Sequence, residues 1–264
     1  MPLKTYSILS YIKHWWNAKP RKGHHIHSPF VYDLVDSIFN QKEAYYVFSK
    51  IEKRREQLLK NKTIITVNDL GAGSRELSSN HRIIKDIARF SLASPKESQF
   101  IFRLINRFQP STLVELGTSL GITSTYMASV NKQSKLYTFE GCSEIAKIAE
   151  QTFRQVRLNN IELIIGNFDD TLAPQLKEIS PIDFALIDGN HRYEPTMRYF
   201  NQLLNKAHSN SIFVFDDIYW SKEMYRAWQD IIKHPKITLS LDLYHMGIVF
   251  FRTENTKQDF KIRW

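Results

Sequence analysis

The sequence is poor in cysteine and has no long apolar run. Cys142 is the single cysteine among 264 residues, so neither an intramolecular disulfide nor a zinc site of several cysteines can form. No apolar stretch approaches the roughly 20 residues of a membrane-spanning helix, and Lys13 and His14 interrupt the one near the N-terminus. These absences predict a soluble, cytoplasmic protein without a membrane span.

Acidic residues are scarce in the N-terminal part. Residues 1–110 hold 19 Lys and Arg against 9 Asp and Glu, whereas residues 111–264 hold 17 against 18. This excess suits a nucleic-acid or membrane partner, but scattered basic residues are more often a solvated surface. Around the run Lys53–Arg55, Glu52 and Glu56 stand at helical spacing, which favours local ion pairs over a phosphate-binding patch.

Residues 1–94 are expected to form a mainly helical extension or lid. One face of the first segment is apolar and consists of Ile8, Tyr11, Ile12, Trp15 and Trp16. This face predicts an amphipathic helix that docks on the chain's own surface, with a membrane surface as the alternative. Three histidines follow, His24, His25 and His27, and a hydrogen-bonded loop is favoured there over a metal site because no carboxylate or cysteine is near. Ser28 and Pro29 predict the cap and first turn of the next helix.

Residues 95–264 alternate short β-rich runs with helical stretches, which is typical of βαβ units and a parallel sheet. We expect strands at 112–116, 135–140, 161–165, 182–188, 211–216, 237–243 and 247–252. Only Tyr244–Met246 joins the last two strands, which is too short for a parallel crossover. The sequence therefore predicts an α/β domain over residues 95–264 whose last strand is antiparallel.

Two segments, Asp69–Gly73 and Glu115–Gly121, could form the turn at which a nucleotide-type cofactor approaches the backbone. Such a cofactor also needs a carboxylate at the tip of the next strand, about 20 residues on, to accept hydrogen bonds from ribose hydroxyls. Only the second segment has one, because Glu140 lies 19 residues beyond Gly121. We therefore interpret Asp69–Gly73 as an ordinary turn.

Carboxylates recur at the ends of later strands. Asp188 ends one apolar strand, and Asp216 and Asp217 end the next, so the three should lie close together if those strands are neighbours. Converging carboxylates repel unless a cation neutralises them, and oxygen ligands suit Mg²⁺, Mn²⁺ or Ca²⁺ better than zinc. His191, three residues after Asp188, is a candidate general base. The alternative is that these aspartates cap turns or pair with nearby arginines.

Four motifs together resemble the class I S-adenosylmethionine (SAM)-dependent methyltransferases, and within them the small-molecule O-methyltransferases of the sugar and catechol type. They are Val114–Gly121, Thr138–Gly141, Leu186–Tyr193 and Phe215–Ile218. The resemblance covers about residues 95–252 and implies a Rossmann-like, doubly wound, seven-stranded sheet with an antiparallel last strand. The chain departs from the catechol-type pattern at His191 and Arg192, where those enzymes usually show a lysine.

The resemblance implies a role for each candidate site residue. The cofactor's methionine part would face Glu115, Gly117, Thr118, Ser119 and Gly121, its ribose would bind Glu140 beside Gly141, and its adenine would lie by Asn167 and Phe168. Asp188, Asp216 and Asp217 would match the ligands of a divalent cation. His191 would be the catalytic base, together with Asp188, which also borders the cofactor site.

The expected activity is methyl transfer from SAM to a hydroxyl group of a small molecule, assisted by Mg²⁺ or a similar cation, in an enzyme that can be a homo-oligomer. The alternative is a methyltransferase that acts on RNA or another nucleic acid through the basic N-terminal half. Asp188–His191 does not match the Asn/Asp-Pro-Pro-aromatic motif of amine-methylating enzymes. A nicotinamide oxidoreductase is disfavoured because Ser119 and Ile122 replace glycines of the dinucleotide fingerprint. A cofactor-binding protein without catalysis would leave the three aspartates unused.

Overall fold

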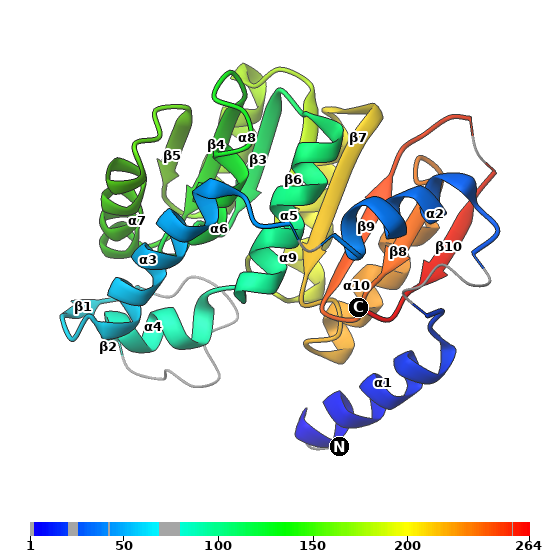
Figure 1. Ribbon diagram of the computed structural model, residues 1–264, viewed down its shortest axis with the longest axis horizontal. Coiled ribbons are helices and arrows are strands. Elements are labelled where there is room, and N and C mark those ends of the chain that lie inside the picture. The colour runs from blue at the N-terminus through cyan, green and yellow to red at the C-terminus, as the bar shows by residue number, and fades with distance from the viewer. Residues whose placement is uncertain (1–2, 21–25, 42, 69–79, 255) are drawn as a thin grey trace. The chain divides into compact units, whose positions relative to one another are not determined.

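The computed structural model describes all residues except 1–2, 21–25, 42, 69–79 and 255. The predicted turn Asp69–Gly73 and the histidines His24 and His25 lie outside the described residues. The chain divides into two compact units: unit 1 comprises Met1–Lys42 and Pro181–Trp264, and unit 2 comprises Glu43–Ser180. The elements of both units are labelled in Figure 1.

Unit 2 is built on three parallel strands, β3 (Thr112–Leu116), β4 (Lys135–Glu140) and β5 (Ile161–Ile165). All three occupy the ranges predicted from the sequence. β4 lies between the other two, and its register pairs Phe139 with Leu116 of β3 and Glu140 with Ile165 of β5. The carboxyl ends of the three strands therefore meet at one edge of the sheet.

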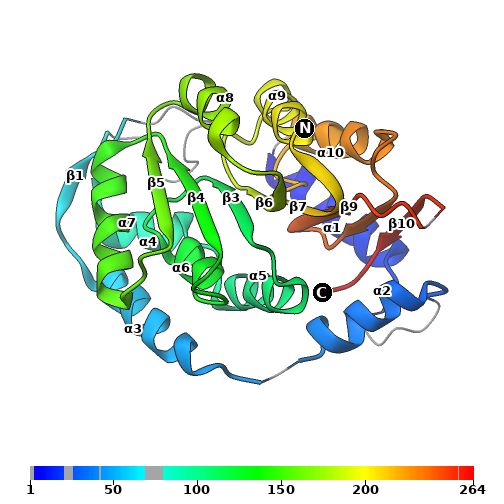
Figure 2. The same ribbon diagram turned by 90° about the horizontal axis from the view of Figure 1, so that it is seen from above.

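Helices cover the strands of unit 2. They are α3 (Tyr46–Lys60), α4 (Ile84–Ser91), α5 (Pro95–Phe108), α6 (Ile122–Ala128), α7 (Ser143–Val156) and α8 (Phe168–Glu178). Figure 2 shows α8 on one face of β3 and β4, and α5 and α6 on the other. The two short strands β1 (Ile64–Thr66) and β2 (His81–Ile83) form a separate antiparallel pair.

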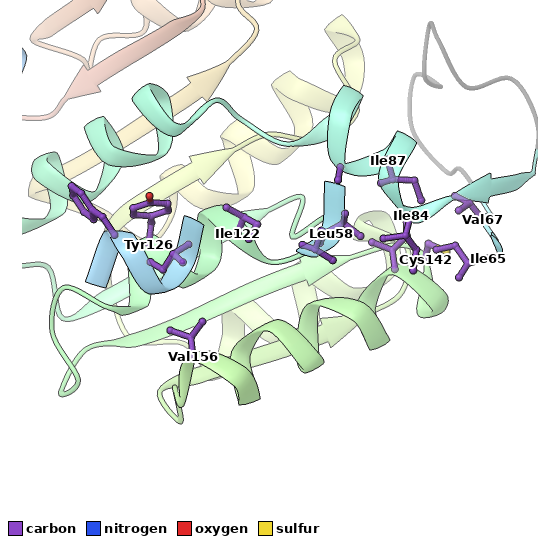
Figure 3. Packing of buried hydrophobic residues seen from close by; sticks show 14 of the residues in the cluster. Leu58, Ile65, Val67, Ile84, Ile87, Ile122, Tyr126, Cys142 and Val156 are labelled. Atoms are coloured by element: carbon purple, nitrogen blue, oxygen red, sulfur yellow. The ribbon is translucent and has the colours of Figure 1, made fainter. Parts of the chain in front are cut away.

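A hydrophobic cluster in unit 2 anchors the turns at the ends of β3 and β4 (Figure 3). Leu120 and Ile122, on either side of Gly121, are fully buried in it. Cys142, just beyond the end of β4, is buried in the same cluster. Both turns are therefore held by apolar packing, which gives a rigid base to the residues that the sequence marked for cofactor binding.

Arg54 and Arg55 of the basic run in α3 make contacts within unit 2. Arg55 is buried and pairs with Glu52 at 2.9 Å, which confirms the predicted local ion pair. Arg55 also donates to the carbonyl oxygen of Ala93 at 2.7 Å, and the Tyr126 hydroxyl donates to Glu52 at 2.8 Å. Burial, reinforced by the hydrogen bond to Glu52, raises the pKa of Tyr126. The run thus holds α3 to neighbouring helices rather than forming a phosphate-binding patch.

Unit 1 contains five strands in the order β10 (Gln258–Lys261), β8 (Leu239–Asp242), β9 (Met246–Phe250), β7 (Ala207–Asp216) and β6 (Ile182–Ile187). β9 is antiparallel to both β7 and β8, which confirms the predicted hairpin, and β6 and β7 are parallel. The sequence did not predict β10, which pairs parallel with β8. Its four residues carry only one strongly apolar side chain, Phe260, so no alternating pattern marks it.

The helices of unit 1 are α1 (Leu3–Asn17), α2 (Pro29–Leu34), α9 (Tyr193–Leu204) and α10 (Lys222–Lys233), and a π-helical turn at Val35–Phe39 continues α2. Ser28 caps α2 and Pro29 occupies its first turn, as predicted. α1 is also helical as predicted, and it contacts unit 1 as expected, but most of its apolar face is exposed. Polar groups on the other side of α1 contact unit 1, and at the edge of the apolar face the Tyr11 ring lies edge-on to Tyr244 at 5.0 Å.

The predicted fold class is confirmed: an α/β architecture with mostly parallel strands and an antiparallel strand near the end. Besides β1 and β2, the described residues form eight strands, one more than expected, because β10 follows the predicted last strand. Within the same residues, no helix combines the length and the apolar character needed to cross a membrane.

Candidate functional site

The glycine turn follows β3 and is tied to the end of β4. The backbone amides of Gly117 and Thr118 both donate to the carbonyl oxygen of Phe139, at 3.0 and 3.1 Å. The φ angles of Gly117, Ser119 and Gly121 are +105°, +49° and +80°, so the turn uses the left-handed region repeatedly. This conformation brings the backbone itself, rather than side chains, to the edge of the sheet.

Glu140 links the three turns at this edge. Its two carboxylate oxygens accept hydrogen bonds from the backbone amides of Ser119 and Cys142, both at 2.9 Å. Its carbonyl oxygen accepts from the amide of Gly166 at 2.9 Å. The structure thus brings Glu140 to the glycine turn, as the sequence spacing predicted, and to the turn after β5, as the family resemblance implied.

The turn after β5 contains the residues expected near an adenine. The Asn167 side chain caps α8 by accepting a hydrogen bond from the amide of Asp169 at 3.1 Å. The Phe168 ring lies edge-on to Phe139, with 6.4 Å between the ring centroids. Gly141, beside Glu140, is half-buried. Asn167 therefore shapes this part of the edge by fixing where α8 begins.

Glu115 is fully buried behind the glycine turn. One of its carboxyl oxygens accepts hydrogen bonds from the hydroxyls of Ser124 and Thr138, the latter at 2.6 Å, and the Thr138 hydroxyl also contacts that of Thr118 at 2.6 Å. The other oxygen, Oε1, is buried without a hydrogen-bond partner. Burial, aided by the charge of Glu140 and opposed by the two hydroxyl hydrogen bonds, raises the pKa of Glu115 to about 7.

Sequence reasoning did not find Ser124 and Thr138 as partners of Glu115. Thr138 stands opposite Glu115 in the register of β3 and β4, and that register cannot be read before the strands are paired. Ser124 lies in the first turn of α6, where a serine is common for other reasons. No spacing rule connects either hydroxyl to a carboxylate.

The raised pKa of Glu115 predicts a pH-dependent stability. Because the ordinary pKa is 4.5 and the folded value is about 7, the folded chain binds the proton more tightly, so the stabilisation is complete below pH 4.5 and is lost as the pH rises through 7. The lost free energy of unfolding is roughly 3 kcal/mol. Glu115→Gln should remove this dependence, as measured by urea unfolding at a series of pH values.

Glu150→Gln is the matched control, since Glu150 is partly exposed on α7 and pairs with the exposed Arg154 at 2.7 Å. It should leave the pH dependence of the wild-type chain unchanged. A difference in unfolding free energy between wild type and Glu115→Gln that stays constant from acid to neutral pH would contradict the assignment.

In unit 1, the register of β6 and β7 pairs Ile187 with Phe215. Asp188 and Asp216 therefore stand at the carboxyl ends of adjacent strands, as predicted. Asp217 follows with φ +52°, and its backbone carbonyl oxygen accepts a hydrogen bond from the amide of Trp220 at 2.7 Å, which closes a tight turn.

His191 lies against Asp188 in the same unit. Its Nε2 atom is 3.6 Å from Oδ1 of Asp188, and both side chains are partly exposed. The His191 ring also lies beside Trp220, with 5.9 Å between ring centroids. A carboxylate in contact with an imidazole can orient the ring and stabilise its protonated form, which is the arrangement that a general base needs.

Asp188, Asp216 and Asp217 supply the oxygen donors that Mg²⁺ prefers. Among the described residues, however, no three His, Cys, Asp or Glu side chains come together closely enough to hold a metal ion. The carboxylates are thus of the right chemical type for a divalent cation, but the described side chains are not arranged as a metal site.

Residues 114–218 match the sequence family described as "Methyltransferase domain". This stretch, less than half of the chain, is similar to methyltransferase domains. It runs from β3 to the end of β7 and contains every candidate site residue that the resemblance had marked. The family resemblance that the four sequence motifs indicated is thereby confirmed.

Two curated relatives also match. The chain is 28% identical over 129 residues to a catechol O-methyltransferase of Niastella koreensis, and 24% identical over 125 residues to a protein-L-isoaspartate O-methyltransferase of Thermosipho melanesiensis. Each match covers 47% of this chain, but only 57% and 59% of the two relatives. The chain thus aligns with little more than half the length of either enzyme.

The chain also resembles solved structures, over a larger share of its length than the curated relatives cover. The O-methyltransferase TomG from Streptomyces achromogenes, which is involved in tomaymycin synthesis and was solved with SAM, superposes with a TM-score of 0.57 at 15% identity. The superposition covers 83% of this chain and 95% of TomG. At this identity the likeness is one of fold alone.

Proposed function

We propose that the chain is a SAM-dependent methyltransferase that acts on a hydroxyl oxygen of a small molecule. The observation that carries the proposal is Glu140, a carboxylate at the tip of β4 that is fixed by the amides of Ser119 and Cys142 beside the glycine turn. A carboxylate can accept about four hydrogen bonds, so backbone amides and the hydroxyls of a ribose can share it. The match to a methyltransferase domain supports the same cofactor class.

The turn Gly117–Gly121 would bind the methionine part of the cofactor through its backbone. Glu115 would act as a positioning residue, because its hydrogen bonds to Ser124 and Thr138 hold the turn from behind. Phe168 and the turn before α8 would border the adenine. A cofactor held in this way is oriented before the acceptor arrives, which is the main requirement for transfer of an activated methyl group.

SAM, when bound, would supply an activated methyl group, whose transfer to a nucleophilic oxygen releases S-adenosylhomocysteine. His191 would accept the proton of the acceptor hydroxyl as the new oxygen–carbon bond forms and the carbon–sulfur bond breaks. Asp188, 3.6 Å from the His191 ring nitrogen, would stabilise the imidazolium that results. Trp220, beside His191, would offer a flat apolar surface to a ring in the acceptor.

Dependence on a divalent cation is a separate part of the proposal. Its support is the strand register that brings Asp188 and Asp216 to adjacent strand ends. The steps above use only protein groups, because the described side chains do not gather into a metal site. Full activity in a chelator would remove the cation from the proposal and leave the rest unchanged.

No observation favours the nucleic-acid alternative. Arg55 of the basic run is buried, and Arg54 donates to the hydroxyl of Thr152 at 3.1 Å. Both guanidinium groups thus make hydrogen bonds within unit 2, which disfavours a role in binding phosphate groups. Residues 1–94 remain, in this proposal, the extension that would help to enclose the acceptor.

The deciding experiment is titration calorimetry of the full chain with SAM and with S-adenosylhomocysteine, each with and without Mg²⁺. We expect binding of both, and a Glu140→Gln variant should bind about 10- to 100-fold more weakly, because hydrogen bonds to a charged group contribute about 1.5–3 kcal/mol. Glu144→Gln, a surface residue of α7 that pairs with Lys147, is the control and should bind like wild type. Absence of binding to either ligand, or tight binding of NADH instead, would contradict the proposal.

A further inference from the structure

The apolar side chains of α1 are exposed. They are Ile8, Leu9, Ile12, Trp15 and Trp16, and Trp16 is 78% exposed and Ile8 60%. At 3.6 residues per turn, these positions form one continuous stripe along the helix. An exposed stripe of this size and aromatic content is uncommon on a soluble chain and marks an interaction surface.

The opposite side of α1 fixes the helix to unit 1. His14 is buried and its ring nitrogen lies 3.1 Å from a carboxylate oxygen of the buried Asp242. The hydroxyl of Tyr244 donates to the carbonyl oxygen of Ser7 at 2.7 Å and lies 3.0 Å from the hydroxyl of Ser10. Ser7, Ser10 and His14 share the face opposite the stripe, so these contacts hold the stripe outward.

This polarity is the reverse of an ordinary surface helix, which buries its apolar face and exposes its polar one. The buried contacts of α1 are hydrogen bonds and a His–Asp pair. At one edge of the apolar face, the guanidinium of Arg263 lies 4.1 Å from the ring centre of Trp15, while Ile8 and Trp16 stay largely exposed. Figure 1 shows α1 beside the N-terminus of the chain. The arrangement is that of a helix displayed for a partner.

The charge around α1 indicates the kind of partner. Residues 1–32 contain five Lys and Arg and no Asp or Glu, since the first acidic residue is Asp33. Lys13 is exposed in α1 itself, and Lys19 follows shortly after the helix. A second copy of the chain would bring two such basic segments together at a cost in repulsion, whereas an anionic surface would attract each one.

We propose that α1 binds the surface of an anionic lipid bilayer. The Ile and Trp side chains would enter the boundary between headgroups and acyl chains, where indole rings are favoured, and the lysines would contact the headgroups. The helix would lie in the plane of the membrane while Ser7, Ser10 and His14 keep it fixed to unit 1. The proposal uses no residue of the methyltransferase domain match and does not depend on the proposed function.

The test is flotation of the full chain with vesicles of phosphatidylcholine alone or mixed with phosphatidylglycerol. We expect at least about tenfold stronger binding to the anionic vesicles, weakened by high salt, because both apolar and charged contacts contribute. Trp16→Ser and Ile8→Ser should each lower this binding several-fold, and Lys13→Glu should lower it through charge alone. Tyr46→Ser is the matched control, since Tyr46 is an exposed aromatic at the start of α3, and it should bind like wild type.

Two results would overturn the proposal. One is equal flotation, or none, with the two kinds of vesicle. The other is a stable dimer in analytical ultracentrifugation that Trp16→Ser dissociates without any vesicle binding by the wild-type chain, which would identify the stripe as a subunit interface. Calorimetry with SAM on the same variants, which should be unchanged, separates failure of this proposal from failure of the proposed function.

Discussion

His191→Asn is expected to lower the rate of methyl transfer by about 100- to 10,000-fold, the range that general-base catalysis contributes. Asparagine is polar but cannot act as a base, and because the His191 side chain is partly exposed, its smaller size should change packing little. The affinity for SAM should stay within a few-fold, because His191 would contact the acceptor rather than the cofactor. Single-turnover kinetics with saturating SAM measures the chemical step directly.

The same unit offers a matched control for this experiment. His208 pairs with Asp183 at 2.9 Å, another partly exposed His–Asp contact, which lies near the first residues of β6 and β7 and not at their carboxyl ends. His208→Asn should leave the rate of methyl transfer unchanged. If His191→Asn retained wild-type rates while Asp188→Ala remained folded and active, the acceptor proton would have another destination and the assignment of the pair would be wrong.

Gly121→Ala should lower the free energy of unfolding by roughly 3 kcal/mol. It should also weaken SAM binding, and more strongly than one methyl group added at another position of the turn. The φ angle of +80° costs an L-residue about 1–2 kcal/mol. A Cβ atom would also lie 2.7 Å from the ring of Phe153 and 3.1 Å from the backbone of Ala149 in α7, and such overpacking costs about 1–3 kcal/mol. Relief of the clash would displace the turn that the cofactor is proposed to contact.

Ser119→Gly separates backbone strain from the clash. Ser119 has φ +49° in the same turn, and glycine there removes strain while keeping the amide that donates to Glu140. Its unfolding free energy should stay close to that of wild type, as followed by chemical denaturation. A Gly121→Ala variant as stable as Ser119→Gly, with unchanged SAM affinity, would show that the turn tolerates movement.

The sheet and half of the site could be predicted because they depend on local pattern. β3, β4 and β5 are apolar runs that end at turn residues, and Glu140 follows Gly121 at a distance set by one helix and one strand. The partners of Glu115 could not be predicted, because they depend on strand register and on a helix turn. The exposure of the apolar face of α1 could not be predicted for a related reason: periodicity locates an apolar face but does not determine what covers it.

The position of Cys142 also bears on how the chain can be studied. Its thiol, the only one in the sequence, is buried in the hydrophobic cluster of unit 2. The backbone amide of Cys142 donates a hydrogen bond to the carboxylate of Glu140. A sulfur in such surroundings is inert in the closed state. The rate at which an alkylating reagent modifies Cys142 should therefore measure local opening of the cluster behind the turn that follows β3, in the native chain and without an introduced label.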